Sequence, residues 1–260
     1  MARSAILNVM VEAALKAARG LTRDFGEVEN LQVSLKGPGD FVSSADKQAE
    51  KTIASMLRKA RPGYAMLLEE GGAIKGEDFQ HRWIVDPLDG TTNFLHSNPL
   101  FCISIALESQ GTIVAGVIYN PITDELFTAE RGQGAFLNDR RLRVSGRRDM
   151  INCLISTGIP HPGKKGHAEF ITQQSTVMGQ SGGVRSLGTA ALSLAYVAAG
   201  RYDGYWEAGL SPWDIAAGLL MVREAGGYVT DFENRDKMFT TGDIIAGNER
   251  VHDQLLKLIK

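Results

Sequence analysis

Hydrophobic positions follow two different rhythms in the first part of the chain. Over residues 6–18, apolar side chains recur at three- and four-residue spacing, which predicts an amphipathic helix with Gly26 beyond its C-terminus. A second helix is predicted to follow Ser43 and to stop at Pro62-Gly63. From residue 64 to residue 144, short or alternating apolar runs lie between turn residues, which predicts antiparallel hairpins. The clearest strands are expected at residues 101–107, 112–119 and 125–129.

A third rhythm begins after the basic segment from Arg140 to Arg148. A buried strand is predicted at residues 151–156, and helices and short strands alternate from there, which indicates an α/β half. Helices are expected at residues 167–178, 189–199 and 213–225, and Asn248 could cap a last helix that runs through Leu258. Strands are expected at residues 202–206, 228–231 and 244–247. The change of rhythm near residues 140–150 divides the chain into residues 1–144, an N-terminal α+β half, and residues 145–260, a C-terminal α/β half.

Composition narrows the class of protein. A chain of 260 residues with 43% hydrophobic and 22% charged residues is typical of a globular protein that buries a substantial core. Its net charge of −2 gives no general attraction to nucleic acid or anionic lipid. Cys102 and Cys153 each lie in an apolar run, which favours two buried thiols over a disulfide. The N-terminus does not resemble a signal peptide, and no apolar run approaches the ~18 residues that cross a bilayer, so we expect a cytoplasmic enzyme.

The most informative motif is Asp86-Pro87-Leu88-Asp89-Gly90-Thr91-Thr92, directly after an apolar run. Proline favours an extended residue before it, so Asp86 is expected to close a strand and a turn to bring Asp89 back beside it. Gly90 lets the backbone approach a ligand, and the threonines offer a hydroxyl and backbone N–H groups to an anion. The motif therefore suits Mg²⁺ bridging to a phosphate, and a simple tight turn is the alternative.

Three further segments place acids in related settings. Glu69-Glu70 follows an apolar run and precedes two glycines, and Ser211-Pro212-Trp213-Asp214 opens an apolar helix with an acid in its first turn. Residues 40–46 lead into another helix. Together, and in this order, the segments resemble the inositol monophosphatase family of Mg²⁺-dependent, lithium-sensitive sugar phosphatases, from residue 40 to residue 227. The resemblance implies a layered sandwich, in which an N-terminal antiparallel sheet with two helices packs on the C-terminal α/β half and the active site lies between them.

The resemblance also implies a metal centre. Two Mg²⁺ ions are expected, and a third, weaker one near Glu69 is also typical of the family. Glu69, Asp86 and the Leu88 carbonyl would hold the first ion, and Asp86, Asp89 and Asp214 the second. Asp86 would then bridge two ions about 4 Å apart, a spacing that flanks an in-line displacement at phosphorus.

Three residues carry the catalytic role by resemblance. Thr91 would hold the attacking water, Asp46 would accept a hydrogen bond from the Thr91 hydroxyl, and Glu69 would serve the metal beside them. From the residues alone, Thr91 could equally be a helix N-cap, and Asp46 could complete a capping box at residues 43–46. Glu70 is expected to be a neighbour of the site rather than a ligand.

Substrate contacts are expected on both halves of the chain. The Gly90 and Thr91 N–H groups should meet the phosphate. Gly188-Thr189-Ala190 resembles the family segment that contacts phosphate and sugar hydroxyls, and an ordinary Thr-capped helix is its alternative. Glu207 matches the family's hydroxyl-binding acid, with an exposed surface glutamate as the alternative, and Asp214 is counted among the substrate contacts as well.

These observations predict hydrolysis of a small polyol phosphate, inositol 1-phosphate first among them. A nucleotide 3′-phosphatase or a fructose-1,6-bisphosphatase with the same metal core is an alternative, and a protein- or RNA-binding scaffold that retains the site is another. The basic segment is expected to be a solvated loop, with RNA or protein contact as its alternative. The five histidines show no metal-ligand spacing, which argues against zinc, and Gly132-Gln133-Gly134 fits a hairpin. A homodimer is expected because family members are commonly dimers.

Overall fold

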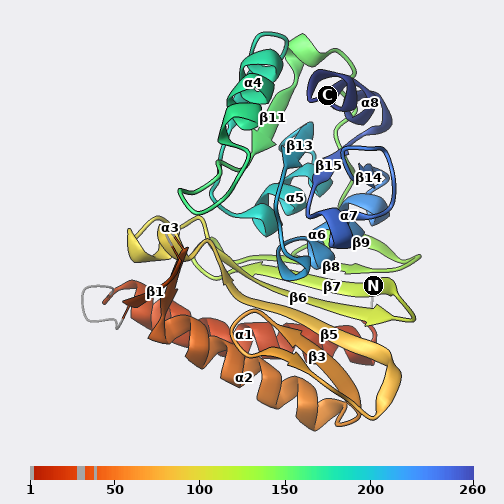
Figure 1. Ribbon diagram of the computed structural model, residues 1–260. Helices are drawn as coiled ribbons and strands as arrows, with labels where there is room; N and C mark the ends of the chain where they lie inside the picture. The colour runs from red at the N-terminus through yellow and green to blue at the C-terminus, as the bar shows by residue number, and fades with distance from the viewer. Residues whose placement is uncertain (1–2, 28–32, 38–39) are drawn as a thin grey trace.

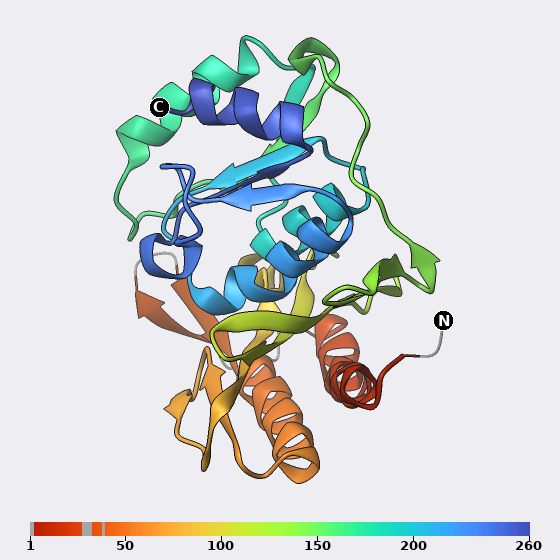
Figure 2. The same ribbon diagram turned by 90° about the vertical axis from the view of Figure 1, so that its right-hand side faces the viewer.

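Two twisted sheets and three layers of helices alternate in the computed structural model (Figures 1 and 2), which describes residues 3–27, 33–37 and 40–260. Helices α1 and α2 cover the outer face of the first sheet, α5 and α6 lie between the sheets, and α4 and α8 cover the second sheet. The layered α/β sandwich expected from the resemblance is confirmed.

The first two helices form where the apolar spacing predicts them. Helix α1 (Ala5–Phe25) is capped at its end by Gly26, as expected. Helix α2 (Ser44–Ala60) begins at a capping box made by Ser43 and ends before Pro62. The short strands β1 (Val33–Gly37) and β2 (Asp40–Ser43) pair antiparallel just before α2.

The first sheet has eight strands in the order β10-β9-β8-β7-β6-β5-β3-β4. Its strands are β3 (Tyr64–Leu68), β4 (Gly72–Ile74), β5 (Asp78–Asp89), β6 (Cys102–Ser109), β7 (Thr112–Asn120), β8 (Glu125–Glu130), β9 (Gly134–Leu137) and β10 (Arg140–Arg141). Neighbours are antiparallel, as predicted, except that β3 and β5 run parallel. The purely antiparallel expectation was wrong there, because β4 turns back along the outer edge and leaves only the inner side of β3 for β5.

The second sheet is mixed, in the order β12-β11-β13-β15-β14. Its strands are β11 (Leu154–Thr157), β12 (Gly183–Arg185), β13 (Gly204–Glu207), β14 (Tyr228–Thr230) and β15 (Ile244–Gly247). Strand β11 is parallel to both neighbours, and the other pairs are antiparallel. The buried strand predicted from residue 151 begins later, because Met150–Asn152 form a 3₁₀ turn and leave Ile151 65% exposed.

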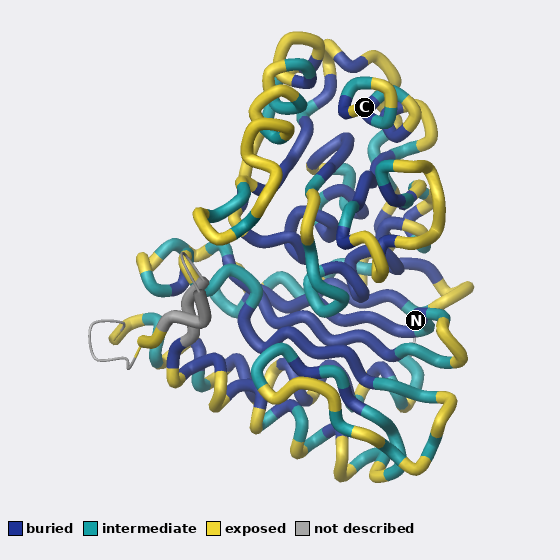
Figure 3. The backbone as a smooth tube through the Cα atoms, in the orientation of Figure 1, coloured by how far each residue is buried: buried dark blue, intermediate teal, exposed yellow. Residues whose placement is uncertain are grey.

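Helices α5 (Ala190–Ala198) and α6 (Pro212–Glu224) are apolar on nearly every side, because each packs between two sheets (Figure 3). Helix α6 approaches the first sheet closely at Gly116, where an added Cβ would lie 3.1 Å from the Cα of Ala217. The outer helices α4 (His167–Met178) and α8 (Glu249–Leu258) have the predicted bounds, with Asn248 as N-cap of α8. The short helix α3 (Thr91–Leu95) begins at the threonines that indicate a helix start in the sequence. The short helix α7 (Met238–Thr241) was not predicted, because a single turn shows no apolar period.

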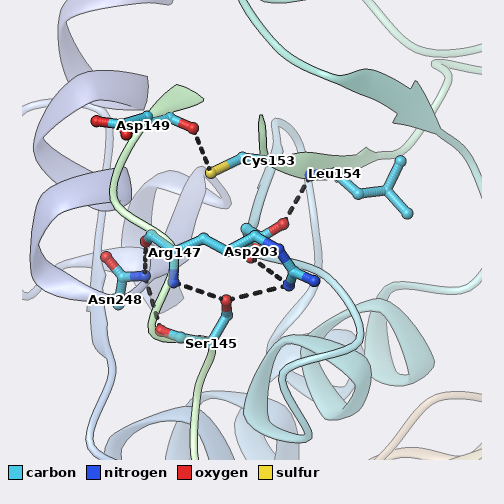
Figure 4. A network of polar contacts seen from close by, with 7 residues as sticks. All are labelled: Ser145, Arg147, Asp149, Cys153, Leu154, Asp203 and Asn248. Atoms are coloured by element: carbon cyan, nitrogen blue, oxygen red, sulfur yellow. Dashed lines mark hydrogen bonds and ion pairs between the residues drawn. The ribbon is translucent and has the colours of Figure 1, made fainter. Parts of the chain in front are cut away.

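The segment that crosses from one sheet to the other is fastened by side chains (Figure 4). Buried Asp203 accepts hydrogen bonds from the Leu154 N–H at 2.7 Å and from Arg147 at 3.3 Å. The Asn248 amide donates to the carbonyls of Ser145 and Arg147, each at 2.8 Å. The basic segment is therefore not simply a solvated loop, since Arg140 and Arg141 also form the edge strand β10.

Two smaller expectations are met. Gly132-Gln133-Gly134 lies at the hairpin between β8 and β9, with Gly134 as the first residue of β9. Cys102 and Cys153 are both buried and free. In the part of the chain that the structure describes, no helix is long and apolar enough to cross a membrane. The first sheet is complete at Arg141 and the second begins at Leu154, while the division at residue 144 stays a prediction.

Candidate active site

A cavity of about 500 Å³ opens between the two halves of the chain. Eight of the predicted site residues line it: Asp89, Gly90, Thr91, Gly188, Thr189, Ala190, Glu207 and Asp214. The cavity therefore brings together the residues predicted to contact phosphate and substrate. Asp46, Glu69, Asp86 and Leu88 do not contribute to its wall.

Asp86 and Asp89 are placed by a bulge at the end of β5. Asp86 lies opposite Ser104 on β6 and Asp89 lies opposite Cys102, so three steps along β5 match two along β6. The expectation that Asp86 closes a strand and a turn returns Asp89 was wrong, because pairing with β6 continues through Asp89. Asp86 is buried and accepts a hydrogen bond from the Leu88 N–H at 2.9 Å.

Asp89 connects the two halves of the molecule. One of its oxygens accepts hydrogen bonds from the Thr189 hydroxyl and from the Ala191 N–H, the latter at 2.7 Å. Thr189 is also the N-cap of α5, which confirms the capping alternative, while its contact with phosphate and sugar hydroxyls stays a prediction. Burial raises the pKa of Asp89 to about 7, against the lowering effect of these hydrogen bonds.

Asp214 lies in the first turn of α6, as predicted. Its carboxylate accepts a hydrogen bond from the Ser211 N–H at 2.7 Å, which completes a capping box. The Ser104 hydroxyl donates to the Trp213 carbonyl at 3.3 Å and ties this helix start to β6. Burial, followed by the charge of Asp89, raises the pKa of Asp214 well above its usual range.

Asp46 makes both of its predicted contacts, while its catalytic role stays a prediction. One oxygen accepts from the backbone and hydroxyl of Ser43 in the capping box, and the other accepts from the Thr91 hydroxyl at 3.1 Å. Asp46 is fully buried, and burial raises its pKa. The alternative that Thr91 is a helix N-cap was wrong, because Gly90 occupies that position with φ of 97° and Thr91 begins the helix. The Thr91 hydroxyl also lies 3.1 Å from the Leu88 carbonyl.

The acids behind the cavity repel one another. Burial raises the pKa of Asp86 well above its usual range, and the charges of Glu69, Asp89 and Asp214 raise it further. Glu69 follows β3, and its N–H donates to the Val85 carbonyl at 3.2 Å. The Glu70 N–H donates to the buried carboxylate of Glu50 at 2.8 Å, which agrees with its place as a neighbour.

This set of donors fits a hard divalent cation by charge and chemistry. Carboxylate oxygens are the ligands that Mg²⁺ prefers, and a cation would offset the mutual repulsion that raises the pKa of Asp86. Among the described residues, no three His, Cys, Asp or Glu side chains already converge as one metal-binding group. The acids therefore fit a metal by charge and chemistry, with Asp86 buried and Glu69, Asp89 and Asp214 partly buried around it.

Glu207 is not a surface acid. It lies on β13 in the cavity wall and accepts a hydrogen bond from the buried Tyr205 hydroxyl, which projects from the same face of the strand. Burial raises the pKa of Glu207, and the nearby positive charge of Lys164 opposes that effect.

Several residues of the cavity were missed by sequence reasoning. Lys164 and His161 come from the loop between β11 and α4, and Asn93 comes from α3. The only signal for the loop was its composition, Gly-Ile-Pro-His-Pro-Gly-Lys-Lys-Gly, which follows the end of a strand. Asn93 stands two residues after Thr91, and nothing in its local pattern separates it from a solvent-facing helical residue.

Comparison with known proteins agrees with this architecture. The sequence profile of the inositol monophosphatase family matches residues 2–260. The chain is 64% identical to an inositol-1-monophosphatase of Mesorhizobium japonicum, over 100% of this chain and 98% of that protein. It is 44% identical to the Nus factor SuhB of Pseudomonas aeruginosa, over 98% of this chain and 96% of that protein. The crystal structure of the extragenic suppressor protein suhB of Bartonella henselae superimposes with a TM-score of 0.97 at 62% identity and covers 99% of each chain.

Proposed function

This chain belongs to the inositol monophosphatase family, and from that premise we propose that it hydrolyses inositol 1-phosphate with Mg²⁺. Its class, a phosphoric monoester hydrolase, follows from family membership. The proposal concerns the substrate, the metal and the roles of individual residues.

One observation carries the proposal: a carboxylate that can accept hydrogen bonds from substrate hydroxyls shares a cavity with the segment whose N–H groups would bind phosphate. Glu207 lies in the wall that also holds Asp89, Gly90 and Thr91. A polyol monophosphate presents both chemistries, because its phosphate is an anion and its ring hydroxyls are hydrogen-bond donors. A cavity of about 500 Å³ is large enough for such a ligand.

Thr91 and Asp46 would orient the attacking water. The Thr91 hydroxyl lies 3.1 Å from an oxygen of Asp46 and 3.1 Å from the Leu88 carbonyl, and its single proton can be donated to either. A lone pair of the threonine oxygen is then left to accept a hydrogen bond from water. The raised pKa of Asp46 makes it a better proton acceptor than an exposed aspartate. The N–H groups of Gly90 and Thr91 would donate to the phosphate oxygens.

The acidic cluster would hold the metal. Glu69, Asp86 and the Leu88 carbonyl would bind one Mg²⁺, Asp86, Asp89 and Asp214 a second, and a third, weaker ion would lie near Glu69. Leu88 accepts one hydrogen bond from Thr91, and the second lone pair of its carbonyl stays available. When bound, Mg²⁺ supplies positive charge that offsets the phosphate and the developing charge on the leaving oxygen.

A panel of phosphate monoesters with Mg²⁺ tests this proposal. Inositol 1-phosphate should have the highest kcat/KM, above fructose 1,6-bisphosphate and a 3′-phosphonucleotide. Glu207→Ala should lower kcat/KM for inositol 1-phosphate, mainly through a higher KM, because it removes a hydrogen bond to a charged group. The loss corresponds to about 1.5–3 kcal/mol of transition-state stabilisation. Turnover of p-nitrophenyl phosphate, which has no matching hydroxyls, should change little. A 3′-phosphonucleotide preference, or no effect of Glu207→Ala, would shift the assignment to the nucleotide phosphatase.

A further inference from the structure

Asn93 joins three segments around the cavity. Its amide nitrogen donates to the Leu100 carbonyl at 2.6 Å and to the Leu187 carbonyl at 2.7 Å, and its amide oxygen accepts from Asn98 at 3.2 Å. Building on the proposed phosphatase function, we propose that Asn93 is a positioning residue. It holds the segment from Leu187 to Thr189 against residues 89–91, whose N–H groups would bind the phosphate.

The orientation of the Asn93 amide follows from its neighbours. Backbone carbonyls can only accept hydrogen bonds, so the NH₂ group must face Leu100 and Leu187. Each of its two protons then has a partner, and the amide oxygen has Asn98. An aspartate at this position would set a carboxylate oxygen against two carbonyl oxygens.

Each tethered segment leads directly to a residue of the site. Leu187 precedes Gly188, with φ of 70°, and then Thr189, whose hydroxyl donates to Asp89. An added Cβ at Gly188 would lie 3.0 Å from the Asn93 side-chain amide nitrogen, so the Asn93 side chain packs closely against the Gly188 backbone. Leu100 leads into β6 beside Asp89, through the pairing of that residue with Cys102.

The tether spans 94 positions of the sequence and links the two halves at the edge of the cavity. Helix α3 has only five residues, so its own backbone hydrogen bonds hold Thr91 weakly. Loss of the Asn93 amide would let Thr91 and Thr189 shift relative to each other. Because small misplacements around the reacting phosphate are costly, the loss should appear in kcat for every ester.

The test compares Asn93→Ala and Asn93→Asp with a matched control, Asn248→Ala. The Asn248 amide nitrogen likewise donates to two backbone carbonyls, here both about a hundred positions away, and its oxygen caps α8, but it lies at the crossing segment (Figure 4). With inositol 1-phosphate and p-nitrophenyl phosphate, Asn93→Ala should lower kcat by between about tenfold and a hundredfold for both esters. Asn93→Asp should lose more, and Asn248→Ala should keep its kcat even if its melting temperature falls.

A folded Asn93→Ala protein with kcat within about twofold of the wild type would overturn the proposal. So would a kcat loss no larger than that of Asn248→Ala. If both Asn93 variants fail to fold, Asn98→Ala is the substitute: it removes the donor to the Asn93 amide oxygen together with the acceptor of the Leu100 N–H, and leaves both bonds of the Asn93 nitrogen. It should show a smaller kcat loss, and an unchanged kcat there would refute the tether. Inactivity of the wild type on every ester would instead refute the proposed function.

Discussion

Gly158→Ala should impair polyol binding without altering any acid of the site. Gly158 is buried just beyond β11 and faces Glu207, and a Cβ built on it would overlap the carboxyl carbon and both oxygens of that side chain. Its φ does not lie in the left-handed region, so the backbone itself accepts alanine. The overlap can therefore be relieved only if Glu207 moves.

The expected loss equals that of one hydrogen bond to a charged group. A displaced Glu207 carboxylate loses the hydrogen bond from the Tyr205 hydroxyl. It also moves away from the position where it would accept a hydrogen bond from a substrate hydroxyl. Such a bond contributes about 1.5–3 kcal/mol, which corresponds to about tenfold to 150-fold in kcat/KM. Because the polyol binds far from phosphorus, the loss should appear mainly in KM.

The assay measures kcat and KM for inositol 1-phosphate and for p-nitrophenyl phosphate at saturating Mg²⁺, with circular dichroism and a melting curve to confirm folding. Gly179→Ala is the control, since its Cβ would make only an ordinary contact, 3.4 Å from the Ser175 carbonyl. An unchanged kcat/KM for inositol 1-phosphate in folded Gly158→Ala would refute the role of Glu207. An equal loss for both esters would place the perturbation in the chemical step.

Three further predictions concern the metal and stability. Mg²⁺ should raise the melting temperature of the wild type above its value in EDTA, because an ion that binds the native state stabilises it. The increase should be much smaller in Asp86→Asn, and equal melting curves of the wild type with Mg²⁺ and with EDTA would contradict the metal site. Gly218→Ala should lower the free energy of unfolding, measured in urea, by about 1–3 kcal/mol, because its Cβ would lie 2.5 Å from the Cβ of Leu194. An unfolding free energy equal to that of the wild type would contradict this packing. Burial lowers the pKa of His252 below 6.5, so below that pH the unfolded chain binds a proton that the folded chain resists. The contribution of His252 should therefore destabilise the protein as the pH is lowered from 7.5 to 5.5, whereas the raised pKa of Asp89 acts in the opposite sense. The difference in unfolding free energy between the wild type and His252→Gln, measured in urea at both pH values, should isolate it, and a difference that does not change with pH would contradict the burial of a neutral His252.

Features that depend on a few neighbouring residues were predictable from the sequence. The bounds of α4, the Asn248 cap of α8 and the capping box at Ser43 follow from apolar spacing and from side chains that bond the backbone within three residues. The acids of the candidate site were visible for the same reason, since they lie within short motifs beside turns and helix starts.

Features that depend on which segments meet needed the folded chain. The parallel pairing of β3 with β5 and the bulge at Asp86 are set by neighbouring strands, and a local pattern is the same whichever strand pairs with it. The same holds for the enclosure of Glu207: the sequence left an exposed surface position open as the alternative, and only the fold places Gly158 and Tyr205 against this side chain. Asn93 reaches Leu187 across 94 positions. Contacts of this kind arise from the packing of the whole core, and so no window of the sequence contains them.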